Sequence, residues 1–154
     1  MADNSIEARL QRFEDTEAIR RLRQQFHRYV NDGEQDRLVS LYTDDALVDF
    51  GPSLRAKGHA EIAALFAKLA GNTSMIKQFS ANHIVDLDGD VATGNAYVDA
   101  RYAANGQSII ACASYDDTYR RTPDGWKFSE MIVHIHFTVP VQEGWGNIVE
   151  RKQG

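Results

Sequence analysis

The sequence predicts an α+β fold in which helices pack on one face of a cone-shaped, curved antiparallel sheet. Apolar residues recur at helical spacing over about residues 5–70, whereas β-rich runs separated by turn signals occupy about residues 77–138. Helices first and strands afterwards are typical of an α+β domain. The 154 residues suit a single domain, 1–154, with a tail at 139–154, and a chain of this length can bury a substantial core.

Three helices and one strand are expected in the first half. The first helix begins near Ile6, keeps an apolar stripe at helical spacing, and ends at Asn31-Asp32-Gly33, where Gly33 suits the position after a helix. A short second helix is expected near residues 38–42, and residues 46–50 are typical of a strand. A third helix is expected after Gly58.

The second half predicts a meander of antiparallel strands. Its turn signals are Asp88-Gly89, Asn105-Gly106 and Pro123-Asp124-Gly125. They separate four runs, at about 77–88, 90–103, 107–121 and 125–138. These runs are longer than the usual strand of about five or six residues. Long, strongly twisted strands curl, so helices lying across them would leave a concave space.

Two adjacent strands carry mostly small residues on one face. These residues are Ala96, Val98 and Ala100 on the first strand, and Ala111, Ala113 and Tyr115 on the second. Alanines fill volume poorly, whereas protein cores are close-packed. Either helix side chains press in closely here, or the strands border an apolar pocket with Tyr115 at its wall.

The composition disfavours several classes of partner. The net charge is −5, and the densest basic group, Arg20-Arg21-Leu22-Arg23, is expected to form a solvated helix face, so nucleic-acid binding is not expected. The lone Cys112 excludes an internal disulfide and suits a small core residue. Neither an apolar signal segment nor a run of membrane-spanning length is visible, which favours a cytoplasmic protein without a membrane partner.

Three segments carry a resemblance to a known family. They are AIRRLRQQFHRYVNDGEQDRLVSLYTDDALVDF, NHIVDLDGDVATGNAYVDARY and YDDTYRRTPDGWKF. Together they resemble the nuclear transport factor 2-like superfamily, within the branch of scytalone dehydratase and the SnoaL-type polyketide cyclases. The resemblance covers about residues 15–137. It implies a single SnoaL-like domain, an α+β barrel with a deep apolar pocket, no cofactor, and homo-oligomers that are dimers or trimers.

The resemblance also implies where catalytic groups should lie. In the dehydratases of this branch, an aspartate at the end of the first long helix orients a histidine on a strand, and tyrosines polarise the substrate carbonyl. At the matching positions this chain has Asn31 and Gln78 instead of the aspartate and the histidine. Phe50, and Phe26 or Val30, stand where tyrosines would be. The shape of the family is therefore retained, and its usual acid/base pair is missing.

Two histidines are candidates for a replacement base. His27 lies one helical turn before Asn31 and on the same face, although a histidine beside an apolar stripe is more often a packed or rim residue. By strict alternation, His83 shares a face with Val85 and Leu87. A β-bulge near Ala81 would turn His83 toward the pocket.

On this basis the sequence predicts a cofactor-independent lyase or isomerase that acts on a small hydrophobic cyclic or aromatic substrate by acid/base catalysis. The catalytic candidates are His27, Asn31, His83 and Tyr115. The candidates for substrate binding are Phe26, Val30, Val48, Phe50, Gln78, Val98, Arg101 and Met131.

Other interpretations stay open. Arg101 suits either a surface ion pair with Asp99 or the binding of an anionic or phenolate oxygen. A metal site is not expected, since His134 and His136 lack a third ligand at suitable spacing. The whole domain could instead be a non-catalytic binding module, or an accessory subunit that docks through its sheet.

Overall fold

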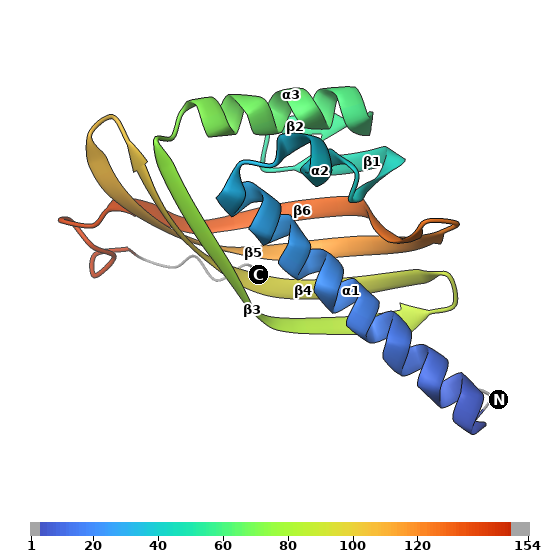
Figure 1. The fold of residues 1–154 in the computed structure, drawn as a ribbon. Coiled ribbons are helices and arrows are strands. Elements are labelled where there is room, and N and C mark those ends of the chain that lie inside the picture. The colour runs from blue at the N-terminus through green and yellow to red at the C-terminus, as the bar shows by residue number, and fades with distance from the viewer. Residues whose placement is uncertain (1–3, 149–154) are drawn as a thin grey trace.

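The chain forms three helices packed on one face of an open, curved, six-stranded sheet (Figure 1). The structure is a computed structural model, and it describes residues 4–148. The elements in chain order are α1 (Ile6–Asp32), α2 (Gln35–Val39), β1 (Tyr42–Asp49), β2 (Arg55–Lys57), α3 (Gly58–Gly71), β3 (Met75–Asp88), β4 (Val91–Ala104), β5 (Gln107–Thr122) and β6 (Gly125–Pro140). The predicted α+β class with a curved sheet under the helices is confirmed.

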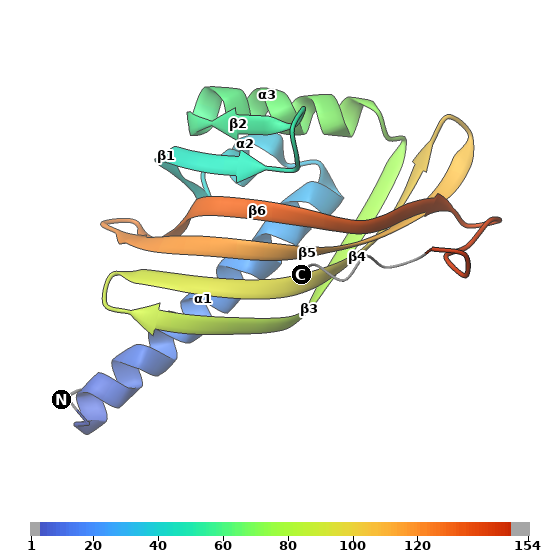
Figure 2. The ribbon, with the colours of Figure 1, turned by 180° about the vertical axis from the view of Figure 1, so that it is seen from behind.

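The sheet has the strand order β2-β1-β6-β5-β4-β3 (Figure 2). Neighbouring strands are antiparallel except β1 and β6, which run parallel. The expectation of a wholly antiparallel sheet is therefore wrong for this one pair, and the sheet does not close into a barrel. The short β2 was not expected, because three residues carry no periodic pattern.

Helix α1 lies diagonally across the sheet (Figure 1). At its start, the side chain of Ser5 accepts a hydrogen bond of 3.2 Å from the backbone N–H of Ala8. At its end, Gly33 takes a left-handed φ of 73°, and its N–H bonds to the carbonyl of Val30. The buried stripe of α1 faces the sheet and includes Ile19 and Phe26. This contact brings the last turns of α1 against β3.

The strand β3 contains a bulge, which reorients its side chains. The pairing of β3 with β4 shifts between Ala81 and Ile84, and Asn82 has a positive φ of 56°. Asparagine tolerates this conformation better than most residues. The orientation of His83 depended on whether β3 has a bulge near Ala81; the bulge is present, and it puts His83 on the inner face of the sheet.

Aromatic residues fill the core at the end of the sheet near the β5–β6 turn. Tyr42, Tyr119 and Phe128 are fully buried. The ring centroids of Tyr42 and Tyr119 lie 5.3 and 5.2 Å from that of Phe128. The opposite end, near the β4–β5 turn, has alanines on the inner face and is less filled. A cavity therefore forms at that end.

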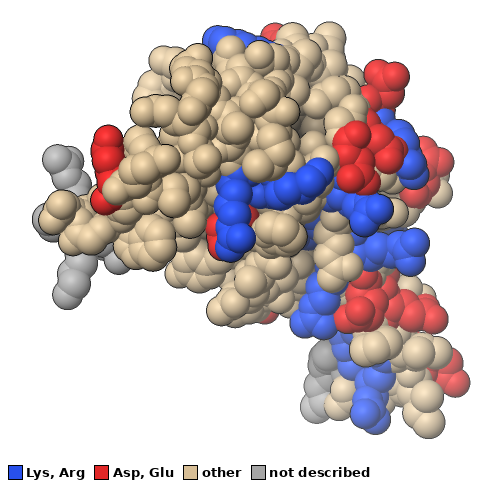
Figure 3. Space-filling model, turned by 60° about the vertical axis from the view of Figure 1, so that its left-hand side comes forward, with Lys and Arg blue, Asp and Glu red and all other residues tan. Residues whose placement is uncertain are grey.

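The surface gives little indication of a polyanionic partner. On the face shown in Figure 3, basic and acidic side chains alternate along the amino-terminal end of α1, and much of the remaining area is uncharged. Within residues 4–148, no helix is long and apolar enough to cross a membrane.

Candidate functional site

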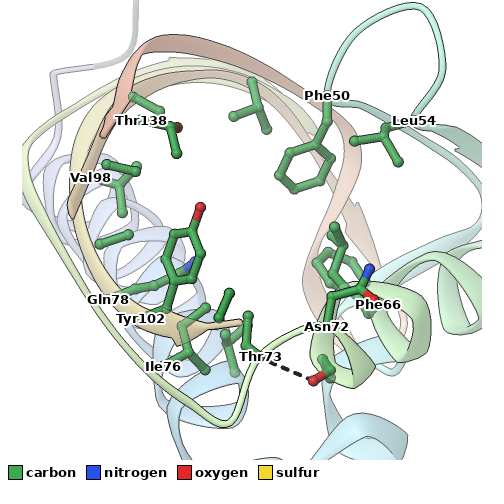
Figure 4. A pocket seen from close by; sticks show the side chains of 18 of the residues that line it. Phe50, Leu54, Phe66, Asn72, Thr73, Ile76, Gln78, Val98, Tyr102 and Thr138 are labelled. Atoms are coloured by element: carbon green, nitrogen blue, oxygen red, sulfur yellow. Dashed lines mark hydrogen bonds between the residues drawn. The ribbon is translucent and has the colours of Figure 1, made fainter. Parts of the chain in front are cut away.

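A cavity of about 830 Å³ lies between the helices and the inner face of the sheet (Figure 4). Phe26 and Val30 of α1 form one wall, and Phe66 of α3 forms another. Phe50 and Leu54 lie in the connection between β1 and β2, beside Phe66 (Figure 4). The size and the apolar lining suit a small organic molecule.

Small side chains keep the sheet wall of the cavity open. Ala100 pairs with Ala111, and Val98 pairs with Ala113, so both strands present little bulk at the same level. All four residues line the cavity. Of the two interpretations left open by the sequence, the structure supports the one in which the alanine-rich faces border a space rather than being filled by helix side chains.

Polar residues interrupt the apolar wall, and three of them come from the sheet strands β3, β4 and β5. Gln78 of β3, Tyr102 of β4 and Tyr115 of β5 all line the cavity. The hydroxyl of Tyr102 points into the space (Figure 4). Burial raises the pKa of Tyr102 and raises that of Tyr115 to about 12, so both phenols keep their proton at neutral pH. The wall therefore presents neutral hydrogen-bond donors.

Asn31 fixes the backbone of Gln78. The Asn31 side-chain oxygen accepts a bond of 2.7 Å from the Gln78 N–H, and the Asn31 amide nitrogen donates one of 2.9 Å to the Gln78 carbonyl. Both polar atoms of the Asn31 side chain are thus engaged with β3. Asn31 was a catalytic candidate, but it does not line the cavity; it joins the end of α1 to the strand and positions Gln78.

His27 fixes the side chain of Gln78. Its Nδ1 lies 3.1 Å from Gln78 Oε1, so Nδ1 carries the hydrogen and the amide group of Gln78 keeps its own donors free. His27 is only 4% exposed, and its Nε2 has no hydrogen-bond partner among residues 4–148. Burial, followed by the nearby charge of Arg23, lowers the pKa of His27 to about 3. His27 is therefore neutral at physiological pH, and it lies behind the cavity wall rather than on it.

His83 occupies a different part of the interior. Its Nε2 lies 3.1 Å from the hydroxyl of Tyr119. Burial, followed by the charges of Arg23 and Arg20, lowers the pKa of His83 to about 4. Although the bulge turns it inward, His83 is not part of the cavity wall. Of the four catalytic candidates, only Tyr115 lines the cavity.

The buried ion pair of Arg23 and Asp117 was missed by the sequence analysis. Arg23 was expected on a solvated face, but it is 1% exposed and donates a hydrogen bond from Nη2 to Asp117 Oδ2. Its position carried a signal, since Arg23 follows Ile19 by four residues and precedes Phe26 by three, within the buried stripe. Arg20 and Arg21 are exposed, as expected.

The candidates for substrate binding other than Arg101 divide into two groups. Phe26, Val30, Phe50, Gln78 and Val98 line the cavity. Val48 and Met131 are fully buried in the core behind it. The thioether of Met131 accepts a hydrogen bond of 3.4 Å from the hydroxyl of Tyr42.

The assignment of Arg101 to substrate binding is corrected. Arg101 is exposed on the outer face of the sheet and lies 3.4 Å from Asp99, so the surface ion pair is the interpretation that the structure supports. Because side chains alternate along β4, Ala100 and Tyr102 face the cavity and Arg101 faces away from it. Tyr102 is a wall residue that the sequence analysis missed.

Comparisons with known proteins agree with this architecture. The profile of the SnoaL-like domain family matches residues 11–132. An uncharacterized protein of Mycobacterium tuberculosis is 30% identical over 100 residues, which cover 60% of this chain and 65% of that protein. The chain thus spans 65% of the length of the curated relatives that it matches.

Two solved structures show the likeness of fold. A hexachlorocyclohexane dehydrochlorinase of Novosphingobium barchaimii matches with a TM-score of 0.77 at 23% identity, over 85% of this chain and 92% of that one. A nuclear transport factor 2-like protein of Novosphingobium aromaticivorans matches with a TM-score of 0.71 at 25% identity, over 87% of this chain and 92% of that one. With the family profile covering most of its length, the chain belongs to the SnoaL-like family and has the nuclear transport factor 2-like fold.

Proposed function

We propose that this chain is a cofactor-independent lyase or isomerase that acts on a small, apolar, cyclic or aromatic molecule carrying a carbonyl or phenolic oxygen. The observation that carries the proposal is the fixed amide of Gln78, which His27 and Asn31 hold from behind and which lies in the wall of the same apolar cavity that Tyr115 lines. The likeness in fold to a dehydrochlorinase, an enzyme that performs an elimination, supports this class of reaction.

The wall residues suit the stabilisation of negative charge on the substrate oxygen. The amide of Gln78 is held by His27 and Asn31 and can donate to an enolate oxygen, and the hydroxyl of Tyr115 is a second available donor. The hydrogen bond from His27 Nδ1 to Gln78 Oε1 withdraws charge from the amide and so strengthens its remaining donors. Such a pair favours loss of a proton from the carbon next to the carbonyl.

His27 lies behind the cavity wall, so it could accept that proton only if its Nε2 becomes exposed to the cavity when the substrate binds. Its ring centroid lies 5.8 Å from that of Tyr115, and the lone pair on Nε2 is unused within the described chain. The low pKa makes His27 a weak base in the empty site. An enolate in the adjoining cavity would raise that pKa, since an opposite charge favours the imidazolium. Proton transfer and enolate formation would therefore be coupled.

A second candidate function is non-catalytic binding of the same kind of molecule. It is favoured by the position of His27, whose free nitrogen is buried behind the wall, and by the use of both Asn31 polar atoms on the backbone of β3. In this case Gln78 and Tyr115 would recognise the oxygen of the ligand without chemistry.

Hydrogen–deuterium exchange of a ketone separates the two functions without knowledge of the natural substrate. The probe is β-tetralone in D2O, with loss of its α-proton NMR signals as the rate and shifts of the protein amides as the binding signal. The variants are His27→Gln, which keeps a donor toward Gln78 and removes the base, and Tyr115→Phe. Arg101→Gln on the outer face is the matched control.

Each result has a definite meaning. Exchange above the solvent rate that is lost in His27→Gln, with binding retained, supports the lyase or isomerase. Binding of the ketone with no exchange above the solvent rate supports the binding module. Absence of binding to the ketone and to a matched phenol, 2-naphthol, would contradict both.

A further inference from the structure

The ion pair of Arg23 on α1 and Asp117 on β5 is almost completely buried. Asp117 is 3% exposed and Arg23 is 1% exposed. Arg23 Nε, Arg23 Nη1 and Asp117 Oδ1 have no hydrogen-bond partner among residues 4–148. Burial of an ion pair is often less favourable than a hydrophobic pair of similar volume. The pair is therefore a candidate for a role other than stability.

The guanidinium of Arg23 lies against the ring of a cavity-wall residue. Its Cζ is 4.0 Å from the ring centroid of Tyr115, 4.6 Å from that of Phe128 and 5.1 Å from that of Phe26. Tyr115 is the one of these three that carries a hydroxyl, and it lines the cavity. A positive charge thus lies against the ring of a tyrosine in the cavity wall.

A cation on the face of a phenol ring stabilises negative charge in the ring and on its oxygen. The hydroxyl becomes a stronger acid and hence a stronger hydrogen-bond donor. The charge of Arg23 acts on Tyr115 in this direction: burial raises the pKa of Tyr115, and Arg23 opposes that rise. Asp117 acts in the opposite sense with a smaller effect on the same pKa.

A chain of hydrogen bonds holds the guanidinium in place. Asp117 Oδ2 accepts from Arg23 and also accepts a bond of 2.7 Å from the hydroxyl of Tyr119. Because the single hydrogen of that hydroxyl is donated to Asp117, its oxygen accepts from His83 Nε2 at 3.1 Å. His83 is therefore the outermost member of a chain that ends at Arg23.

Two local features of the sequence make room for this chain. The bulge at Asn82 turns His83 inward. Gly94, on the neighbouring strand, has no side chain: a Cβ there would stand 3.2 Å from His83 Nε2 and 3.0 Å from the ring of Tyr119. Any larger residue at position 94 would force these two side chains apart.

We propose that His83, Tyr119, Asp117 and Arg23 form a positioning unit, which holds a positive charge behind Tyr115 and so strengthens the hydrogen bond that Tyr115 gives to the ligand oxygen. This inference rests on the proposed function only in using the same cavity and the same hydroxyl. None of the four residues lines the cavity. Each acts through the next, and Arg23 acts through the ring of Tyr115.

The test measures the acidity of the hydroxyl at position 115 without any ligand. A fluorinated tyrosine placed there titrates at lower pH than tyrosine, so 19F NMR can follow its ionisation in the folded protein. The comparison is between the native background and Arg23→Gln with Asp117→Asn, which removes both charges and keeps amide hydrogen bonds. The expected result is a titration moved upward by about one pH unit in the variant, roughly tenfold less ionised at a given pH.

A matched control removes a different ion pair between α1 and β5. Arg121 donates two bonds of 2.7 Å to the carboxylate of Asp15, so Arg121→Gln with Asp15→Asn changes the same number of charges between the same elements. The titration at position 115 should stay where it is in the native background. An equal upward shift in this control, or no shift in the Arg23 and Asp117 variant, would overturn the proposal.

A second double variant without charges covers the case in which the first variant does not fold. Arg23→Met with Asp117→Leu replaces the ion pair by apolar residues, and either folded variant decides the question by the same titration. If neither variant folds, the pair is a requirement of the fold, and its assignment as a tuning unit fails.

Binding of 4-nitrophenol keeps this result separate from the proposed function. The charge-free variant should bind this probe about tenfold more weakly than the native protein, in proportion to the loss of donor strength at Tyr115. If the native protein does not bind 4-nitrophenol while the titration still shifts, then the positioning unit stands and the proposed ligand class fails.

Discussion

Protonation of His27 should make the fold strongly sensitive to acid. The pKa of His27 is about 3 in the folded chain, against about 6.5 in an unfolded one. The unfolded state therefore binds more protons between these two values, so stability rises with pH across that window. The contribution is fully present above about pH 6.5 and is lost progressively as the pH falls toward 3.

The magnitude follows from the two pKa values. Between about pH 7 and pH 4.5, the unfolded histidine gains its proton and the folded one does not, which lowers the free energy of unfolding by roughly 2–3 kcal/mol. His83, whose pKa is also lowered, acts in the same direction. It is only partly buried, so solvent screening makes its contribution smaller.

Urea denaturation at the two pH values measures the effect, with His27→Gln as the decisive comparison. The native chain should lose about 2–3 kcal/mol more stability than this variant over the interval. His134→Gln is the control, since it removes a histidine from the outer face and leaves His27 in place. Parallel pH dependences for the native chain and His27→Gln would refute the reasoning, because His27 would then titrate alike in both states.

Four further results are expected. Gly94→Ala should lower the free energy of unfolding by about 1–3 kcal/mol, because a Cβ there would meet a backbone carbonyl oxygen at 2.9 Å. Gly71→Ala is the control in the same urea denaturation: its surroundings are open, so the free energy of unfolding should change by under about 1 kcal/mol. Ala111→Leu should fill the cavity and weaken binding of 2-naphthol roughly tenfold without loss of stability, as calorimetry and denaturation can show. Asn31→Ala removes both bonds to β3 and should cost about 1–3 kcal/mol in urea denaturation. Ketone exchange should stay level between about pH 5 and 8, because His27 is already neutral there; a rise through pH 6.5 would contradict this.

The strands of the second half were predictable because their limits are set by local chemistry. The turns at Asp88-Gly89 and Asn105-Gly106 separate strands that end within a few residues of the expected positions. The parallel pairing of β1 with β6 was not predictable in this way, since it joins segments about eighty residues apart. No turn motif in the sequence indicates such a pairing.

Side-chain alternation explains both a success and an error at the site. It put Ala100 and Ala111 on one wall of the cavity, where the structure has them. The same rule requires Arg101 to point the other way, and only its charge suggested a role in binding. Arg23 is the converse case, because its spacing on α1 indicated burial while its charge suggested solvent. What the sequence could not supply was Asp117, the partner 94 residues away that makes burial of Arg23 tolerable.

The site differs from the acid/base pair implied by the family resemblance in where its charge lies. An aspartate and a histidine at positions 31 and 78 would place ionisable groups at the cavity itself, but Asn31 and Gln78 are neutral at every pH. The charge is found one layer deeper, on Arg23 and Asp117, screened from the ligand by the rings of Tyr115 and Phe26. A ligand would thus meet neutral donors whose strength is set by charges that it does not touch. Such a wall favours an oxygen that gains negative charge within the cavity over one that arrives already charged, because neutral donors do not offset the cost of removing a full charge from water.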